Sequence, residues 1–281
     1  MSRILAWEVS DPFWSRVEPL IPVKERNPDK VYLRKPGGGR KPIEYRRIFE
    51  GIIYVLRTGC QWKALPKEQF GSPSSVHRYF REWGLACLFL QLWQAGLAEY
   101  DDMEGIAWDW QSIDGCMIKA PLALESVGRK PTDRGKMGTK RPLLVDGRGV
   151  PLSIDVTGAN RHDVTQLENV LDGIVIQRPE VTEDSPQNLC ADKGYHGQPA
   201  LDVICERGYQ PHVVPRGEER ESKKHVPGYK ARRWVVEASP SWFNRFRKLL
   251  VRFEKTDASY IALLSLASAI IAWRKIGIIY G

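Results

Sequence analysis

Apolar residues recur at helical spacing through most of the first hundred positions of the chain. The run Ser10-Asp11-Pro12 predicts a helix start, because a capping side chain stands before a proline in the first turn. That helix ends at Pro22, a second covers about 44–57, and a third covers about 74–93. Three short helices with basic flanks suit a helix-turn-helix-like DNA-binding module, and a plain helical bundle suits them equally well.

The periodicity changes near residue 107, where alternating residues of 108–118 share one face of a predicted strand. Two apolar runs on either side of Asp146-Gly147-Arg148-Gly149 predict a β-hairpin. Beyond it, the pattern predicts a helix at 164–171, a strand at 188–192, a helix at 201–207, a strand at 212–215, and then a basic loop and two helices. This order indicates an α/β domain with a mixed sheet.

Composition excludes wholesale disorder and a membrane span. The 281 residues are 42% hydrophobic and 27% charged, which is ordinary for a globular protein of one large domain or two smaller ones. The most apolar segment, 258–273, is too short to cross a bilayer and contains three serines, so we expect a buried helix. Five scattered cysteines without zinc-site spacing fit a reducing cytoplasm.

Charge is segregated along the chain. The net charge is +8, but the stretches 24–47, 129–148 and 216–255 carry +6, +5 and +7, which leaves the remainder at about −10. Separate basic patches of this kind point to a polyanionic partner such as nucleic acid. Solvated loops and helix faces remain the competing interpretation of any one patch.

Two aspartates stand on predicted strands. Asp114 lies between apolar neighbours in the middle of one strand, and Asp192 ends another. A buried aspartate is costly unless it is paired, hydrogen-bonded or bound to a metal, and two on adjacent strands repel each other unless a cation lies between them. A strand-end aspartate that faces solvent or bonds a backbone amide is the competing interpretation.

Glu237 is a third candidate carboxylate, in a basic segment that ends at a proline. If the segment is helical, Arg233 and Glu237 form an i,i+4 pair, and a surface ion pair is the simpler interpretation. Pro240 kinks or restarts the helix one turn later, which would let Glu237 tilt toward the sheet.

Several sequence blocks carry a family resemblance that spans essentially the whole chain. The blocks are Tyr45-Arg46-Arg47-Ile48, Arg57-Thr58-Gly59-Cys60-Gln61-Trp62, Gly158-Ala159-Asn160-Arg161-His162-Asp163, Ala191-Asp192-Lys193-Gly194-Tyr195 and Arg233-Trp234-Val235-Val236-Glu237. They resemble bacterial insertion-sequence DDE transposases of the large family numbered five. The resemblance implies a helical leader domain at 1–104 and a ribonuclease-H-like catalytic domain at 105–281, with a mixed sheet flanked by helices.

The resemblance also implies a chemistry. Asp114, Asp192 and Glu237 become the catalytic, metal-binding triad, at intervals of 78 and 45 residues. The implied cofactors are two Mg²⁺ or Mn²⁺ ions, which suit phosphodiester cleavage. The implied partners are double-stranded terminal inverted repeats and target DNA, joined through a freed 3′-hydroxyl by a homodimer or larger assembly. The expected location is the bacterial cytoplasm at the nucleoid, away from membranes.

The chain departs from its relatives near Glu237. They often carry a lysine seven residues after the glutamate, where this chain has Asn244, so Arg245 or Lys248 is expected to contact phosphate. A tyrosine that often stands three residues before the arginine is replaced by Lys230. The full set of expected DNA-binding residues is Arg40, Lys41, Arg46, Arg47, Arg161, Lys193, His196, Arg233, Arg245 and Lys248.

Two other functions stay compatible with the sequence. One is a host-adapted nuclease or resolvase that keeps the fold and hydrolyses DNA without strand transfer. The other is a catalytically silent DNA-binding regulator, although an intact triad argues against it.

Overall fold

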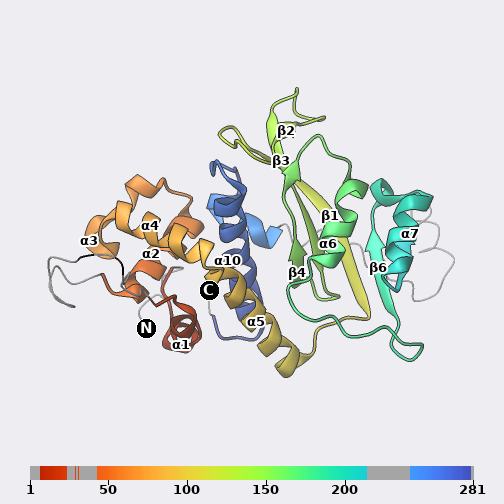
Figure 1. Ribbon diagram of the computed structural model, residues 1–281, viewed down its shortest axis with the longest axis horizontal. Helices are drawn as coiled ribbons and strands as arrows, with labels where there is room; N and C mark the ends of the chain where they lie inside the picture. Colours follow the sequence, from red (N-terminus) through yellow and green to blue (C-terminus); the bar gives the residue numbers. More distant parts are fainter. Residues whose placement is uncertain (1–6, 24–28, 30, 32–42, 214–240, 280–281) are drawn as a thin grey trace.

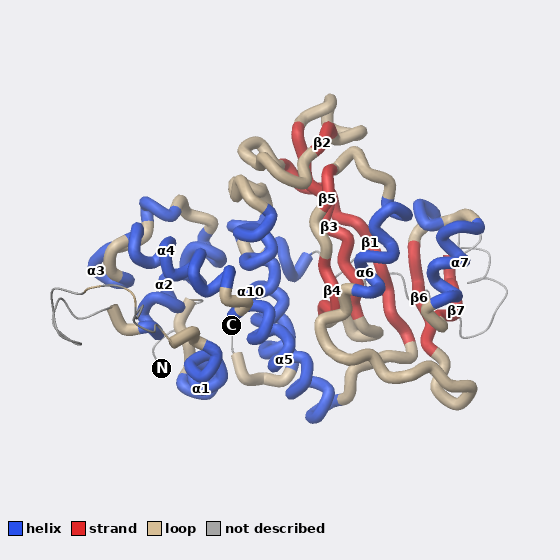
Figure 2. Tube along the Cα trace, viewed as in Figure 1, coloured by secondary structure: helices blue, strands red, loops and turns tan. Residues whose placement is uncertain are grey.

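The structure is a computed structural model that describes residues 7–23, 29, 31, 43–213 and 241–279 (Figure 1). Glu237, Arg233, Arg40 and Lys41 therefore lie outside the described residues, as does the side chain of Lys193. Helices fill the N-terminal part and a sheet fills the middle of the chain (Figure 2).

The N-terminal part begins as its capping signals predict. Ser10 caps α1 (Asp11–Val17), its hydroxyl accepting a hydrogen bond from the Phe13 amide at 3.4 Å. A left-handed Gly59 (φ 72°) ends α2, as glycine at this position can without strain. The remaining elements of this part are η1 (Glu18–Leu20), α2 (Tyr45–Thr58), η2 (Trp62–Ala64), α3 (Lys67–Phe70), α4 (Pro73–Leu85) and α5 (Leu88–Glu104).

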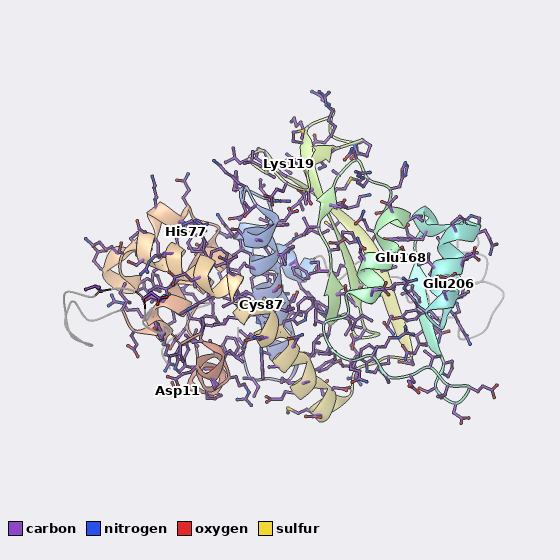
Figure 3. The ribbon with its side chains drawn as sticks, in the orientation of Figure 1. Asp11, His77, Cys87, Lys119, Glu168 and Glu206 are labelled. Atoms are coloured by element: carbon purple, nitrogen blue, oxygen red, sulfur yellow. The ribbon has the colours of Figure 1, made fainter. Side chains whose placement is uncertain are left out.

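The predicted single helix at 74–93 is wrong, because the chain breaks into α4 and α5 at Cys87 (Figure 3). Cys87 adopts a left-handed backbone (φ 58°) that a continuing helix excludes. The break lets both helices pack on one later helix, α10 (Asp257–Lys275). A Cβ at Gly84 would stand 3.2 Å from Ala262 of α10, so α4 approaches it closely. The apolar pattern runs through the break and so gave no sign of it.

The sheet has β1 (Trp110–Lys119) at its centre. Its strand order is β2-β3-β1-β6-β7, with β4 and β5 also paired to β3. β1 runs antiparallel to β3 and parallel to β6, and β6 runs parallel to β7. The other strands are β2 (Gly128–Arg129), β3 (Met137–Val145), β4 (Pro151–Ile154), β5 (Thr157–Gly158), β6 (Gln187–Ala191) and β7 (Tyr209–Val213).

This strand arrangement confirms the predicted mixed sheet. The predicted hairpin is β3 and β4, joined through the turn at 146–149. The short strands β2 and β5 were not predicted, because two residues carry no periodic signal. The predicted helices appear as η3 (Asp163–Gln166) with α6 (Leu167–Asp172), and as α7 (Gln198–Glu206), which lie over the sheet in Figure 1.

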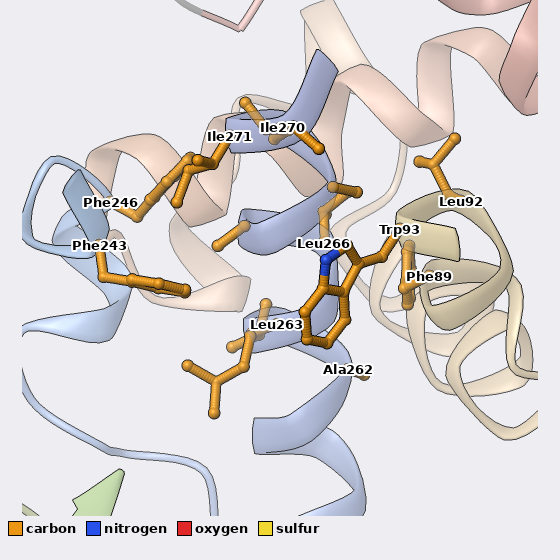
Figure 4. Packing of buried hydrophobic residues seen from close by; sticks show 14 of the residues in the cluster. Phe89, Leu92, Trp93, Phe243, Phe246, Ala262, Leu263, Leu266, Ile270 and Ile271 are labelled. Carbon is orange, nitrogen blue, oxygen red and sulfur yellow. The ribbon is translucent and has the colours of Figure 1, made fainter. Parts of the chain in front are cut away.

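Helix α10 joins the two parts of the molecule. It is the buried helix expected at 258–273, and it packs along α5, which belongs to the predicted leader domain (Figure 4). The Trp273 indole of α10 donates to the Leu92 carbonyl at 3.2 Å, and the Trp93 indole of α5 donates to the Pro151 carbonyl of β4 at 3.1 Å. The division at residue 104 stays a prediction, and it separates two helices that share one core. None of the described helices is long and apolar enough to cross a bilayer.

Gly96 tests the packing of α5 on α10. A Cβ at this position would stand 2.8 Å from the Trp273 ring nitrogen, so Gly96→Val should lower the free energy of unfolding by about 1–3 kcal/mol. Ala98→Val, at an exposed position of the same helix, should lower it by less than about 0.5 kcal/mol. Urea unfolding followed by circular dichroism measures both, and equal effects would contradict the close approach.

Candidate active site

The two predicted aspartates lie on neighbouring parallel strands. Asp114 is in the middle of β1, and Asp192 directly follows β6. Ser112 pairs with Cys190 in this ladder, so two further residues along each strand bring Asp114 and Asp192 to the same level. Both side chains are half-buried. The sheet therefore brings together the two residues that were predicted from strand placement.

Each aspartate accepts a hydrogen bond from the backbone amide of a nearby glycine. The Gly115 amide donates to Asp114 Oδ1 at 2.8 Å, and the Gly194 amide donates to Asp192 Oδ1 at 2.6 Å. Backbone bonding of this kind was the competing interpretation of both residues. It fixes the orientation of each carboxylate.

A third carboxylate, Asp163, stands between the elements that carry these two aspartates. A Cβ added to Gly115 would lie 2.5 Å from Asp163 Oδ1, and a Cβ added to Gly194 would lie 3.4 Å from Asp163 Oδ2. The same point at Gly194 is 2.8 Å from Asp192 Oδ1. Gly115 therefore leaves the space that Asp163 occupies, and Gly194 leaves space for the Asp192 carboxylate. Asp163 was not predicted as a site residue, although it ends the sequence block 158–163. The glycines close to Asp114 and Asp192 were the sequence feature that indicated a third side chain nearby.

Lys140 of β3 compensates the charge of Asp163. Its Nζ lies 3.0 Å from Asp163 Oδ1 and donates to the Arg161 carbonyl at 2.7 Å. The Lys140 side chain is 7% exposed and that of Asp163 is 29% exposed, so the pair is only partly screened by water. The ion pair holds the start of η3 against the central strands.

Tyr195 adds a buried hydroxyl beside the acidic groups. Its side chain is 1% exposed, and its hydroxyl has no hydrogen-bond partner among the described residues. Burial raises the pKa of Tyr195 well above its usual value, and the negative charges of Asp163, Asp114 and Asp192 raise it further. The phenol therefore stays protonated at neutral pH and can donate a hydrogen bond into the acidic cluster.

Two of the three metal ligands expected from the sequence, Asp114 and Asp192, are among the described residues. Within the described ranges, no group of three histidine, cysteine, aspartate or glutamate side chains is placed to hold one ion. Glu237, the third expected ligand, lies outside those ranges. The carboxylate oxygens of Asp114 and Asp192 are the ligand type that Mg²⁺ and Mn²⁺ prefer, so the residues present fit a divalent cation.

Basic residues expected to bind DNA fall into two groups. Arg161, His196 and Arg245 are exposed. Arg46 instead pairs with Asp11 at 2.6 Å, Arg47 donates to the carbonyls of Glu68 and Gln69, and Lys248 pairs with Glu254 at 3.2 Å. The side chains in the second group hold the protein together, which no sequence pattern indicated.

Arg245 lies in a strongly positive environment. Burial, together with the nearby charges of Arg274 and Arg245, lowers the pKa of Arg57 to about 10. The positive charges of Arg57, Arg245 and Arg274 repel one another, so an anion bound nearby would be stabilised. The Arg57 side chain also lies over the Phe246 ring, 4.5 Å from its centre, which fixes one of the three.

A mixed sheet that sets two carboxylates side by side at its centre defines a site suited to metal-dependent phosphodiester chemistry. Residues 101–272 match the family model "Transposase DDE domain", and residues 9–93 match "Putative transposase of IS4/5 family". The chain belongs to the DDE transposase family. It is an insertion-sequence transposase, an enzyme that cleaves DNA and transfers its strands, as the sequence motifs predicted.

Relatives of known sequence support this assignment. The chain is 34% identical over 158 residues to a Burkholderia cepacia protein named "Putative transposase for insertion sequence element IS402", covering 53% of this chain and 69% of the relative. It is 30% identical over 128 residues to an uncharacterized 16.2 kDa protein of IS402, covering 44% of this chain and 80% of that protein. The solved catalytic domain of Mos1 mariner transposase matches at a TM-score of 0.30 and 9% identity, over 69% of this chain and 94% of that one.

The pairing of Lys140 with Asp163 can be measured by a double-mutant cycle. Lys140→Met leaves the Asp163 carboxylate without its counter-charge, and Asp163→Asn leaves the buried ammonium without one. Each single variant should lose stability, and the double variant should recover part of it, with a coupling of about 1–3 kcal/mol in urea unfolding. Additive effects would show that the two groups do not interact.

Proposed function

We propose that Asp114, Asp192 and Glu237 form the metal-binding catalytic triad of this transposase. The parallel register of β1 and β6, which sets the two aspartates side by side, is the observation that carries the proposal. Divalent cations held there would activate the attacking oxygen and stabilise the leaving oxygen of a phosphodiester. The chain would cut at terminal inverted repeats and join the freed 3′-hydroxyl to target DNA. Two ends must be joined, so we expect at least a dimer on DNA, acting at the bacterial nucleoid.

Asp163 acts in this proposal as a positioning residue. Its carboxylate is neutralised by Lys140, so it adds little net charge beside the two aspartates. It fills the space above Gly115 and Gly194, the residues whose amides orient Asp114 and Asp192. The buried Tyr195 phenol, protonated at neutral pH, lies near the three carboxylates and adds no negative charge to them.

The triad is tested by Asp192→Asn. The amide keeps the shape of the side chain and removes its negative charge, so cleavage of a terminal-repeat duplex in Mg²⁺ should fall by at least about a hundredfold. Binding of the same duplex should change by less than about threefold. Electrophoresis of labelled DNA measures cleavage and a mobility shift measures binding. Full cleavage by the variant would remove Asp192 from the triad.

Strand transfer is tested separately with a pre-cut terminal repeat that carries a 3′-hydroxyl. Incubation with plasmid and Mg²⁺ should give joined products, and the same end with a 3′-deoxy terminus should give none. Cleavage without joining would favour a nuclease, and binding with neither activity would favour a silent regulator.

Arg245, rather than Lys248, is the proposed phosphate contact near the triad. Arg245 is exposed in a positive environment, whereas the Lys248 ammonium is paired with Glu254. Arg245→Ala should weaken DNA binding and lower the slope of log affinity against log salt by about one, and Lys248→Ala should leave that slope unchanged. Anisotropy titrations at several salt concentrations measure both slopes. The reverse order would assign the contact to Lys248.

A further inference from the structure

A groove runs between α4 and the segment 248–259, away from the aspartates of the proposed triad. Two adjoining hollows of about 390 and 470 Å³ share Trp62, His77 and Arg81 in their walls. The far wall of the second hollow includes Phe253 and Thr256. None of these residues belongs to the set of DNA-binding residues expected from the sequence.

Aromatic rings form the floor of the groove. The Trp62 ring lies 4.8 Å from the ring of His77 and 4.8 Å from that of Phe80, at interplanar angles of 36° and 31°. Trp62 and His77 are half-buried and line both hollows, so their rings are partly open to the groove. Burial lowers the pKa of His77, and the charges of Arg81 and Lys248 lower it further, which keeps the ring neutral at pH 7. His77, labelled in Figure 3, belongs to α4.

The cations of the groove fall into two kinds. Arg78 pairs with Glu82 at 3.3 Å, and Lys248 pairs with Glu254 at 3.2 Å, so both acidic side chains are neutralised. The other cations of the walls are Lys63, Arg81 and Lys255. They form no ion pair within the part of the chain that the structure describes. The groove therefore offers positive charge beside flat rings.

The wall formed by 248–259 is held firmly. Arg252 is fully buried, its amide donates to the Lys119 carbonyl of β1 at 2.8 Å, and its guanidinium pairs with Asp257 at 2.7 Å. Thr256 caps α10 by accepting from the Ser259 amide at 3.4 Å. A wall fixed to the central strand keeps the hollow open without a ligand, which lowers the ordering cost of binding.

We propose that this groove binds an unpaired nucleotide of a DNA end, with the base against the Trp62 ring and the flanking phosphates near Arg81, Lys63 and Lys255. Rings that take a base face, beside cations that follow the backbone, are the combination that binds single-stranded nucleic acid. A paired base would present only its edge to the groove floor. The proposal rests on the proposed function, because a transposon end is the DNA that this chain would hold.

Two fluorescent probes test the groove, a blunt terminal-repeat duplex and the same duplex with a short single-stranded overhang. Anisotropy titrations without divalent cations keep binding separate from cleavage. The wild type should bind the overhang probe more tightly. Trp62→Ala should weaken overhang binding about tenfold and blunt binding by less than about twofold, and Trp62→Phe should restore most of the loss.

Arg81→Ala supplies a second variant, because Arg81 is exposed and its loss leaves the core intact. It should weaken overhang binding about threefold to tenfold, and Lys275→Ala, an exposed cation at the end of α10, should leave binding unchanged. Melting temperatures check that each variant is folded. Overhang binding that is unaffected by Arg81→Ala, or an equal loss for both probes in folded Trp62→Ala, would overturn the proposal.

Failure of this proposal is distinguishable from failure of the proposed function. If the wild type binds both probes equally yet joins pre-cut ends, the groove assignment is wrong and the transposase chemistry stands. If it prefers the overhang but neither cuts nor joins, the groove assignment stands and the proposed triad fails.

Discussion

Carboxylates that lie close together on neighbouring strands repel one another. The residues around the candidate site reduce this repulsion. Asp163 forms an ion pair with the buried ammonium of Lys140, while Asp114 and Asp192 each accept a hydrogen bond from a backbone amide. Gly115 leaves room for the third side chain, since a Cβ there would stand 2.5 Å from Asp163 Oδ1. The remaining negative charge is what a divalent cation would neutralise, so the same constraint that shapes the site also suits it to metal-dependent phosphodiester chemistry.

Strand β1 connects this site to the rest of the molecule. It carries Asp114, pairs in parallel with β6, and bonds at its end to the segment that forms one wall of the groove. Helix α10 follows that segment and packs along α5, so the helical part is attached to the sheet through a shared core. A DNA end held in the groove would therefore lie on a part of the molecule that shares its core with the sheet whose central strand bears Asp114.

Most elements were predictable because they carry local signals. The cap at Ser10 marks where α1 begins and the glycine after α2 marks where that helix ends, and both are signals from residues next to the helix. The break at Cys87 was not predictable, because the apolar face of α4 continues into α5 and only contact with α10 requires the turn. The short strands β2 and β5 were not predictable for a related reason, because each is defined by its pairing with β3 and not by a pattern of its own.

The sequence by itself determined the family, the strand placement of Asp114 and Asp192, and the chemistry that paired carboxylates suit. Those features follow from local sequence patterns and from the spacing of motifs, so they can be predicted without knowing which distant residues are in contact. Only the tertiary structure decided that Asp163 stands beside the two aspartates, because β3 and η3 must fold onto β1 to bring it there. It also decided which cations are taken up by internal ion pairs and which are left for DNA, since charge alone does not reveal a partner across the fold.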